Sequence, residues 1–114
     1  MNTREYLNKL KSGASIEFSD FIELIDSEYY FSNIAFENGE IMNSKSENQC
    51  SAKVFCFGHM HSLSESEVLN CFAEHYQSVM ESPEDEDSHL NIRSFMFHGW
   101  KGLLIDFDAL KINS

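Results

Sequence analysis

The sequence predicts an α+β fold with about four helices and a small antiparallel sheet. Apolar residues recur at helical spacing in several segments, and an Asn-Gly pair between two short apolar runs predicts a β-hairpin. The segments do not alternate in the regular strand-helix-strand order that a parallel sheet requires. The chain has 114 residues, a length that favours one domain over residues 1–114.

The N-terminal part of the chain predicts two helices. Thr3 is placed to cap a first helix over residues 4–12, which Gly13 would end. A second helix is expected to begin at Ser19 and to continue to Tyr30. Both have an apolar face at helical spacing, formed by Tyr6, Leu7 and Leu10 in the first and by Phe21, Ile22, Leu24, Ile25 and Tyr29 in the second.

The middle of the chain predicts the hairpin and a loop. The segment from Ile34 to Met42 contains Asn38-Gly39, a pair favoured in hairpin turns because both residues tolerate a positive φ. Residues 43–52 are polar and rich in serine, which predicts a surface loop. Residues 53–57 are apolar, and their pattern is compatible with a buried strand or with a short helix.

A long helix is predicted over residues 64–81. Ser64 and Glu67 have the spacing of a capping box, in which each side chain satisfies a backbone N–H of the other residue. Pro83 prevents a simple continuation. The expected apolar stripe contains Val68, Leu69, Phe72, Tyr76, Val79 and Met80.

A last helix is predicted after the charged segment 84–87. Ser88 is placed to cap it, His98 would be its last residue, and Gly99 is a natural stop. Residues 103–107 then predict a strand. The core face of this last helix is expected to contain Ile92, Phe95 and Met96.

The charge of the chain excludes several classes of function. Nineteen acidic and eight basic residues give a formal net charge of −11, which repels nucleic acids and anionic membranes. No apolar run is long enough for a membrane span, and no signal peptide is evident. The three cysteines show no CxxC spacing, which indicates free thiols in a reducing cytoplasm.

Two groups of residues have some features of a metal site. Cys56, His59 and His61 lie close together in sequence but lack a second ligand pair at zinc-site spacing. Cys71 and His75 stand at i and i+4 on the long helix, where a half-buried cysteine beside a hydrogen-bonded histidine explains them equally well. The sequence therefore predicts no metal and no cofactor.

The segment 88–100 has the highest density of polar side chains on an apolar background. In a helix, His89 and Arg93 share one border of the apolar face and Asn91 lies near the other, which argues against a simple triad. One interpretation is a structural network in which Arg93 binds an acidic or carbonyl partner. The alternative is a pocket or partner surface that contains His75, His89, Arg93 and Trp100.

Two blocks of this sequence resemble the HopJ type III effector family. The first runs from Leu63 to Tyr76 and ends in Glu-His-Tyr, and the second is the His89-x-Asn-Ile-Arg93 motif with Gly-Trp after it. The matched positions span most of residues 34–110. The resemblance singles out, as motif residues with a functional or structural role, Glu74, His75, Tyr76, His89, Asn91, Arg93, Gly99 and Trp100.

The resemblance implies a small bacterial protein of the type delivered through type III secretion. It implies no catalytic residue, and Ser88 separates Asp87 from His89 where family members often have an Asp-His pair. We therefore expect a cytoplasmic or exported chain that binds a protein partner, a host protein if exported, and that is not an enzyme. The alternative is a small-ligand-binding protein or enzyme with a pocket formed by His75, His89 and Arg93.

Overall fold

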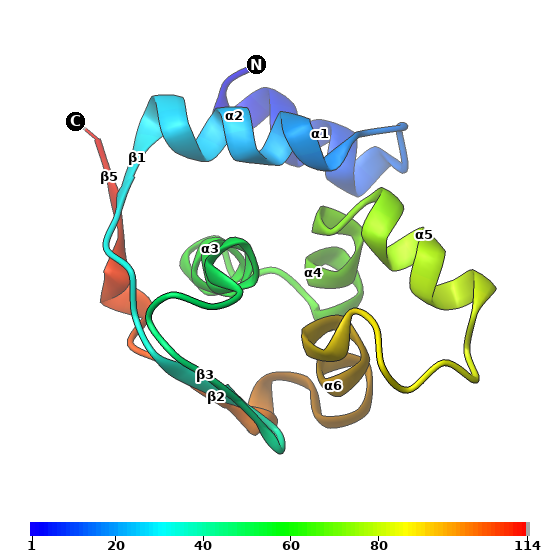
Figure 1. Cartoon of the computed structure of the whole chain (residues 1–114). Coiled ribbons are helices and arrows are strands. Elements are labelled where there is room, and N and C mark those ends of the chain that lie inside the picture. The colour runs from blue at the N-terminus through cyan, green and yellow to red at the C-terminus, as the bar shows by residue number, and fades with distance from the viewer. Residues whose placement is uncertain (114) are drawn as a thin grey trace.

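The structure, a computed structural model, describes residues 1–113. It confirms an α+β fold with a small antiparallel sheet (Figure 1). Residues 1–113 form six α-helices rather than the four expected. These are α1 (Thr3–Ser12), α2 (Phe18–Glu28), α3 (Gln49–Met60), α4 (Glu65–Cys71), α5 (Glu74–Glu81) and α6 (Leu90–His98).

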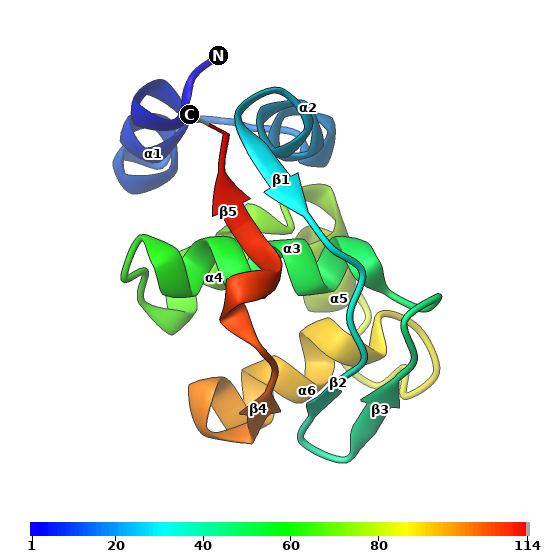
Figure 2. The ribbon, with the colours of Figure 1, turned by 90° about the vertical axis from the view of Figure 1, so that its left-hand side faces the viewer.

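The strands are short and pair antiparallel in two sheets. One sheet joins β1 (Tyr29–Phe31) to β5 (Leu110–Ile112), which lie side by side in Figure 2. The other has the order β3-β2-β4. Its strands are β2 (Phe36–Asn38), β3 (Ile41–Asn43) and β4 (Leu103–Leu104), and the 3₁₀ helices are η1 (Gly99–Gly102) and η2 (Phe107–Ala109).

Helix α3 lies at the centre of the molecule, with the other helices and the strands around it (Figure 1). Its central residues are buried on every side, including Val54, Phe55 and Phe57. A helix that is apolar all round has no amphipathic pattern to reveal it. The predicted loop over residues 43–52 is therefore wrong from Gln49 onward, where α3 begins. The apolar residues 53–57 are part of the same helix.

The long helix predicted over 64–81 is broken into α4 and α5. The break is at Ala73, whose φ is 52° and ψ is −121°. Such a conformation costs a residue with a β-carbon about 1–3 kcal/mol, which packing around it must offset. The Phe72 ring packs between Phe55, at 5.8 Å between centroids, and Phe18, at 6.3 Å. This packing is a tertiary effect that helical periodicity does not record.

Several element ends also differ from the prediction. Asn2, rather than Thr3, caps α1 and accepts a hydrogen bond from the Glu5 N–H at 2.8 Å. Helix α2 ends at Glu28, because the next three residues pair with β5. The predicted strand over 103–107 is a strand only in β4. Among residues 1–113, no helix combines the length and apolar character that crossing a membrane requires.

The hairpin is confirmed, with a shift of its turn by one position. Asn38 pairs with Ile41, so the two turn residues are Gly39 and Glu40. Gly39 has a φ of 61°, and a β-carbon there would collide with the His98 ring. Asn38 is not at the turn because its side chain is fully buried and bonds to α6.

Candidate functional site

Asn91 belongs to a buried network of three asparagines that ties the hairpin to α6. Its Oδ1 accepts hydrogen bonds from Asn38 Nδ2 at 3.1 Å and Asn43 Nδ2 at 3.3 Å. Its Nδ2 donates to Asn43 Oδ1 at 3.0 Å, and its backbone oxygen accepts from Asn38 Nδ2 at 2.8 Å. The Asn91 amide is thus satisfied within the protein, and we assign it a structural role.

Arg93 holds the segment between α5 and α6. Its Nε donates to the Ser88 carbonyl at 2.7 Å, its Nη2 to the Ser82 carbonyl at 2.9 Å and its Nη1 to the Pro83 carbonyl at 3.5 Å. The partners of this guanidinium are therefore main-chain oxygens. A fork of several fixed N–H donors suits such a cluster of carbonyls.

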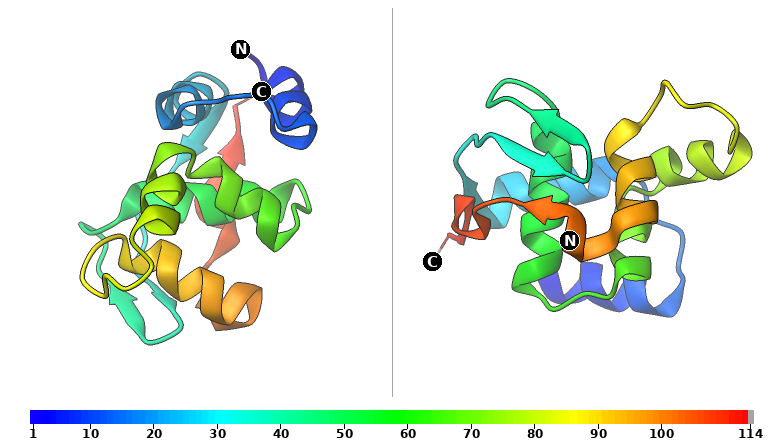
Figure 3. Two further views of the ribbon diagram at one scale, coloured as in Figure 1. Left: turned by 90° about the vertical axis from the view of Figure 1, so that its right-hand side faces the viewer. Right: turned by 90° about the horizontal axis from the view of Figure 1, so that it is seen from below.

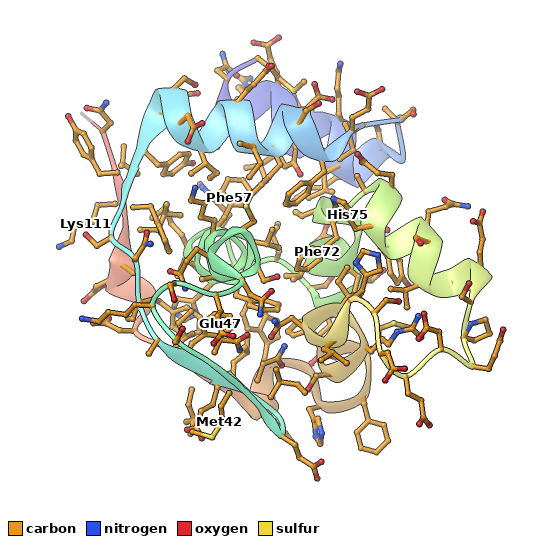
Figure 4. The ribbon with its side chains drawn as sticks, viewed as in Figure 1. Met42, Glu47, Phe57, Phe72, His75 and Lys111 are labelled. Carbon is orange, nitrogen blue, oxygen red and sulfur yellow. The ribbon has the colours of Figure 1, made fainter. Side chains whose placement is uncertain are left out.

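His75 and His89 come together at the edge of a pocket. Their ring centroids are 5.4 Å apart, and His75 also lies edge-on to Phe18 at 5.0 Å. Figure 4 shows His75 close to Phe72, and both line this pocket. The volume is about 590 Å³, and no hydrogen bond within residues 1–113 engages either imidazole. Arg93 does not line it.

Two helices begin at the wall of the same pocket, which we call the His75–His89 pocket. Asn48 precedes α3 with a φ of 53°, and His89 precedes α6 with a φ of 51°. Neither start has a side-chain cap, and the first residues of both helices line the pocket. His89, rather than the predicted Ser88, is therefore the N-cap of α6. Uncapped N–H groups at helix starts attract negative charge, so the pocket can accommodate a small anion.

Gly99 and Trp100 form the corner after α6. The Glu65 carboxylate of α4 accepts a hydrogen bond from the Trp100 N–H at 3.0 Å. Gly99 has a φ of 63°, and a β-carbon there would collide with that carboxylate. The Trp100 ring packs edge-on against Phe95, at 5.4 Å between centroids. This corner lies outside the His75–His89 pocket.

Glu74 and Tyr76 have positions that also support the fold. The Glu74 carboxylate accepts a hydrogen bond from the Phe18 N–H at 2.7 Å, at the start of α2. This bond lowers the pKa of Glu74 below its usual value. The half-buried Tyr76 packs against the hydrophobic core. Both residues line a separate hollow between α5 and the segment that joins α1 to α2.

The residues considered for a metal site are dispersed. Burial raises the pKa of the Cys56 and Cys71 thiols to about 12, so neither is a ready thiolate. His59 stacks on Phe107 at 3.8 Å, and His61 shares a hydrogen bond of 2.9 Å with the Tyr29 hydroxyl. Within residues 1–113, no three His, Cys, Asp or Glu side chains are placed to hold a metal ion together.

A third hollow, which sequence reasoning missed, runs along α5 and α6. We call it the α5–α6 groove; its volume is about 910 Å³. Phe97 is 85% exposed there, Met80 56% and Met96 44%, whereas Met96 was expected in the core. The run Phe95-Met-Phe97 could have revealed it, because one helix face cannot bury three consecutive apolar residues. The lining comprises Glu40, Ile41, Val79, Met80, Pro83, Asp85, Glu86, Leu90, Arg93, Ser94, Met96, Phe97 and His98.

The fold and these surfaces define a small acidic α+β protein with two open hollows beside α6. The chain belongs to the HopJ type III effector protein family, whose sequence model matches residues 3–110. It is also similar to a solved structure described as "Crystal structure of unknown function protein VPA0580". The two share 36% identity and a TM-score of 0.93 over 99% of this chain and 95% of that one. No curated protein sequence matches the chain.

Proposed function

We propose that this chain is an effector-type protein that acts by binding a protein partner rather than by catalysis. The α5–α6 groove carries this proposal. Four large apolar side chains, Met80, Leu90, Met96 and Phe97, line it and are 43% to 85% exposed. Contiguous exposed apolar surface on a small protein commonly marks an interaction site. Membership in a type III effector family agrees with a function exerted through binding.

The roles of the motif residues also favour binding over catalysis. Asn91 and Arg93 direct their polar groups to partners inside the protein, and Glu74 receives the first N–H of α2. Catalysis requires a nucleophile, an acid or a base within reach of a reacting atom. Two of the three thiols are buried and protonated, and the polar side chains of α6 mostly serve the fold.

The direct test of binding places a photo-crosslinking amino acid at Phe97 in the groove. The matched control carries it at Met42 of β3, which is 76% exposed and points away from the centre of the molecule in Figure 4. We expect a discrete adduct with one protein from position 97, lost when Met96→Ser is added. Equal adducts from both positions, or none from position 97 of the folded chain, would contradict the proposal.

Export is a separate part of the proposal, supported by the family. A translocation reporter fused to the full chain tests it, with a strain that lacks the secretion apparatus as the control. We expect delivery from the secretion-competent strain alone. Lack of delivery from both strains would place the binding partner inside the producing cell.

The His75–His89 pocket supports a second candidate, a site for a small anionic ligand. The specific observation is a pair of imidazoles with no hydrogen bond within residues 1–113, 5.4 Å apart on the wall of an open pocket. Asp87 also lines the pocket and opposes a highly charged anion.

Titration with inorganic phosphate, followed by the imidazole resonances in NMR spectra, tests this candidate. We expect the resonances of His75 and His89 to shift together, and those of the exposed His98 to stay in place. The variant His75→Ala/His89→Ala should abolish saturation, and His98→Ala should retain it. Phosphate-independent spectra up to millimolar concentration would exclude the site.

A further inference from the structure

We propose that the α5–α6 groove binds a basic amphipathic helix of the partner protein. This inference rests on the proposed function and adds the chemistry of the partner. The apolar face of that helix would lie on Met80, Leu90, Met96 and Phe97. Its lysines or arginines would face the carboxylates of Glu40, Asp85 and Glu86 at the rim.

The shape of the groove favours a helix as its occupant. Helix α6 lies between α5 and the hairpin when seen from below (Figure 3), and residues of all three elements line the groove. A groove between helices accepts an apolar helix face with anchors at i, i+3, i+4 and i+7. An extended peptide would instead pair with the free edge of a strand.

The apolar floor is adaptable. Two of its exposed side chains, Met80 and Met96, are flexible and polarisable, and such residues adjust to partner side chains of different shape. Phe97 offers a rigid ring that is 85% exposed. Among residues 1–113, the only aromatic ring in contact with it is that of His98, at 4.7 Å between centroids. An aromatic residue this exposed is a natural anchor for a partner.

The acidic residues at the rim of the groove favour a partner with positive charge. Residues 82–89 join α5 to α6 and contain four acidic residues and no lysine or arginine. Asp85 is held in place by hydrogen bonds from the Asp87 N–H at 2.8 Å and the Ser88 hydroxyl at 2.7 Å. Arg93 also lines the groove, but its donors already bind three carbonyls. Complementary charge at a rim steers association and selects the partner.

Charge also argues against the other possible occupants. A second copy of this chain carries the same net charge of −11, and an anionic membrane would be repelled. The basic residues Lys9 and Lys11 do lie on a helix, α1, but its apolar residues Tyr6 and Leu10 are buried within the chain. Another copy therefore has no free basic amphipathic helix in α1 to donate.

A synthetic peptide tests the inference directly. The probe is a helix of about 18 residues, roughly five turns, with leucines at i, i+3, i+4 and i+7 and lysines elsewhere. Controls are a scrambled peptide of the same composition and a version with glutamate in place of lysine. We expect fluorescence anisotropy to show binding of the lysine helix, and at least about tenfold weaker binding of both controls.

Variants of the protein locate the contact. Phe97→Ser should weaken binding of the lysine helix by about tenfold or more, because it removes the exposed anchor. Met42→Ser, on the opposite side of the sheet from α6, should leave the affinity unchanged. The double variant Glu40→Lys/Glu86→Lys should weaken binding of the lysine helix, and this effect should be largest at low salt. The control Glu23→Lys/Asp26→Lys makes the same change in net charge on α2 and should leave the affinity unchanged.

Binding of the scrambled peptide as tightly as the amphipathic one would overturn the inference, as would an unchanged affinity of Phe97→Ser. Sedimentation that shows a dimer lost in Phe97→Ser would assign the groove to a second copy and overturn it too. If a partner crosslinks at position 97 but the lysine helix does not compete with it, only the inference that the partner presents a basic helix would be refuted. Failure of both peptide binding and crosslinking would refute the proposed function as well.

Discussion

Helix α6 carries two sets of side chains that differ in how completely they are bonded to the rest of the protein. In the first set, Asn91 and Arg93 lie on different sides of the helix but direct their hydrogen-bonding groups to the hairpin and to the segment before the helix. In the second set, Met96 and Phe97 are exposed beside the α5–α6 groove. We call the first set the closed face and the second set the open face.

The comparison separates residues that maintain the fold from residues that remain free to bind. A change on the closed face leaves buried polar groups without partners, so it should lower the free energy of unfolding. A change on the open face removes little internal contact, so it should affect binding without affecting stability. Most of the hydrogen-bonding side chains that are closely spaced in residues 88–100 therefore serve the fold.

The largest effect on stability is expected from Asn91→Ala. This change removes the three hydrogen bonds that the Asn91 amide makes with Asn38 and Asn43 in the buried network. Each lost hydrogen bond costs about 1 kcal/mol, so we expect a loss of about 3 kcal/mol in urea unfolding. The control Asn8→Ala, on the exposed side of α1, should change stability by less than about 0.5 kcal/mol. A small effect of Asn91→Ala would mean that the closed face is not structural.

Arg93→Ala is expected to cost about 2 kcal/mol, because it removes three hydrogen bonds to carbonyls that hold the segment before α6. Arg93→Lys should recover only a small part, since one ammonium does not reproduce the guanidinium fork. Thermal unfolding of the three proteins measures this. Full recovery by lysine would show that charge, rather than geometry, is what this position supplies.

A smaller effect is expected from pH, through Glu74. The hydrogen bond from the Phe18 N–H lowers the pKa of Glu74 from its usual 4.5. A carboxyl with a lowered folded-state pKa stabilises the protein above pH 4.5, and this contribution is lost as the pH falls through the lowered value. Because glutamine has no titratable carboxyl, the free energy of unfolding of Glu74→Gln should fall less steeply than that of the wild type as the pH drops below 4.5. An unchanged pH dependence of stability would show that Glu74 does not contribute to it.

The smallest effect on stability is expected from Phe97→Ser on the open face. With 85% of the side chain exposed, the free energy of unfolding should change by less than about 0.5 kcal/mol. Chemical denaturation beside the wild type measures it. A loss of several kcal/mol would show that Phe97 packs within the protein and that the two faces do not differ.

The sequence predicted the elements whose signals are local. The α+β class, the hairpin and the ends of helices at Gly13 and Gly99 follow from turn residues and spacing, and the structure has them. For α3, the sequence left residues 53–57 open between a strand and a short helix and predicted a loop where the helix begins, because a helix buried all round lacks a polar face. It did not predict the break at Ala73, which depends on Phe72 packing between distant rings.

The candidate site was predictable in part. Helix spacing separated Asn91 from His89 and Arg93, and the structure places these residues in three different environments. The approach of His75 to His89 depends on the turn between α5 and α6, which no local pattern specifies. The α5–α6 groove depends on which of three consecutive apolar residues faces inward, and tertiary packing decides this.

The central claim is that the open face of α6 binds a basic amphipathic helix while the closed face maintains the fold. The most direct test measures, for Phe97→Ser, both the affinity for the lysine helix and the free energy of unfolding. The account predicts an affinity at least about tenfold lower, with stability within about 0.5 kcal/mol of the wild type. Wild-type affinity in this variant would contradict it.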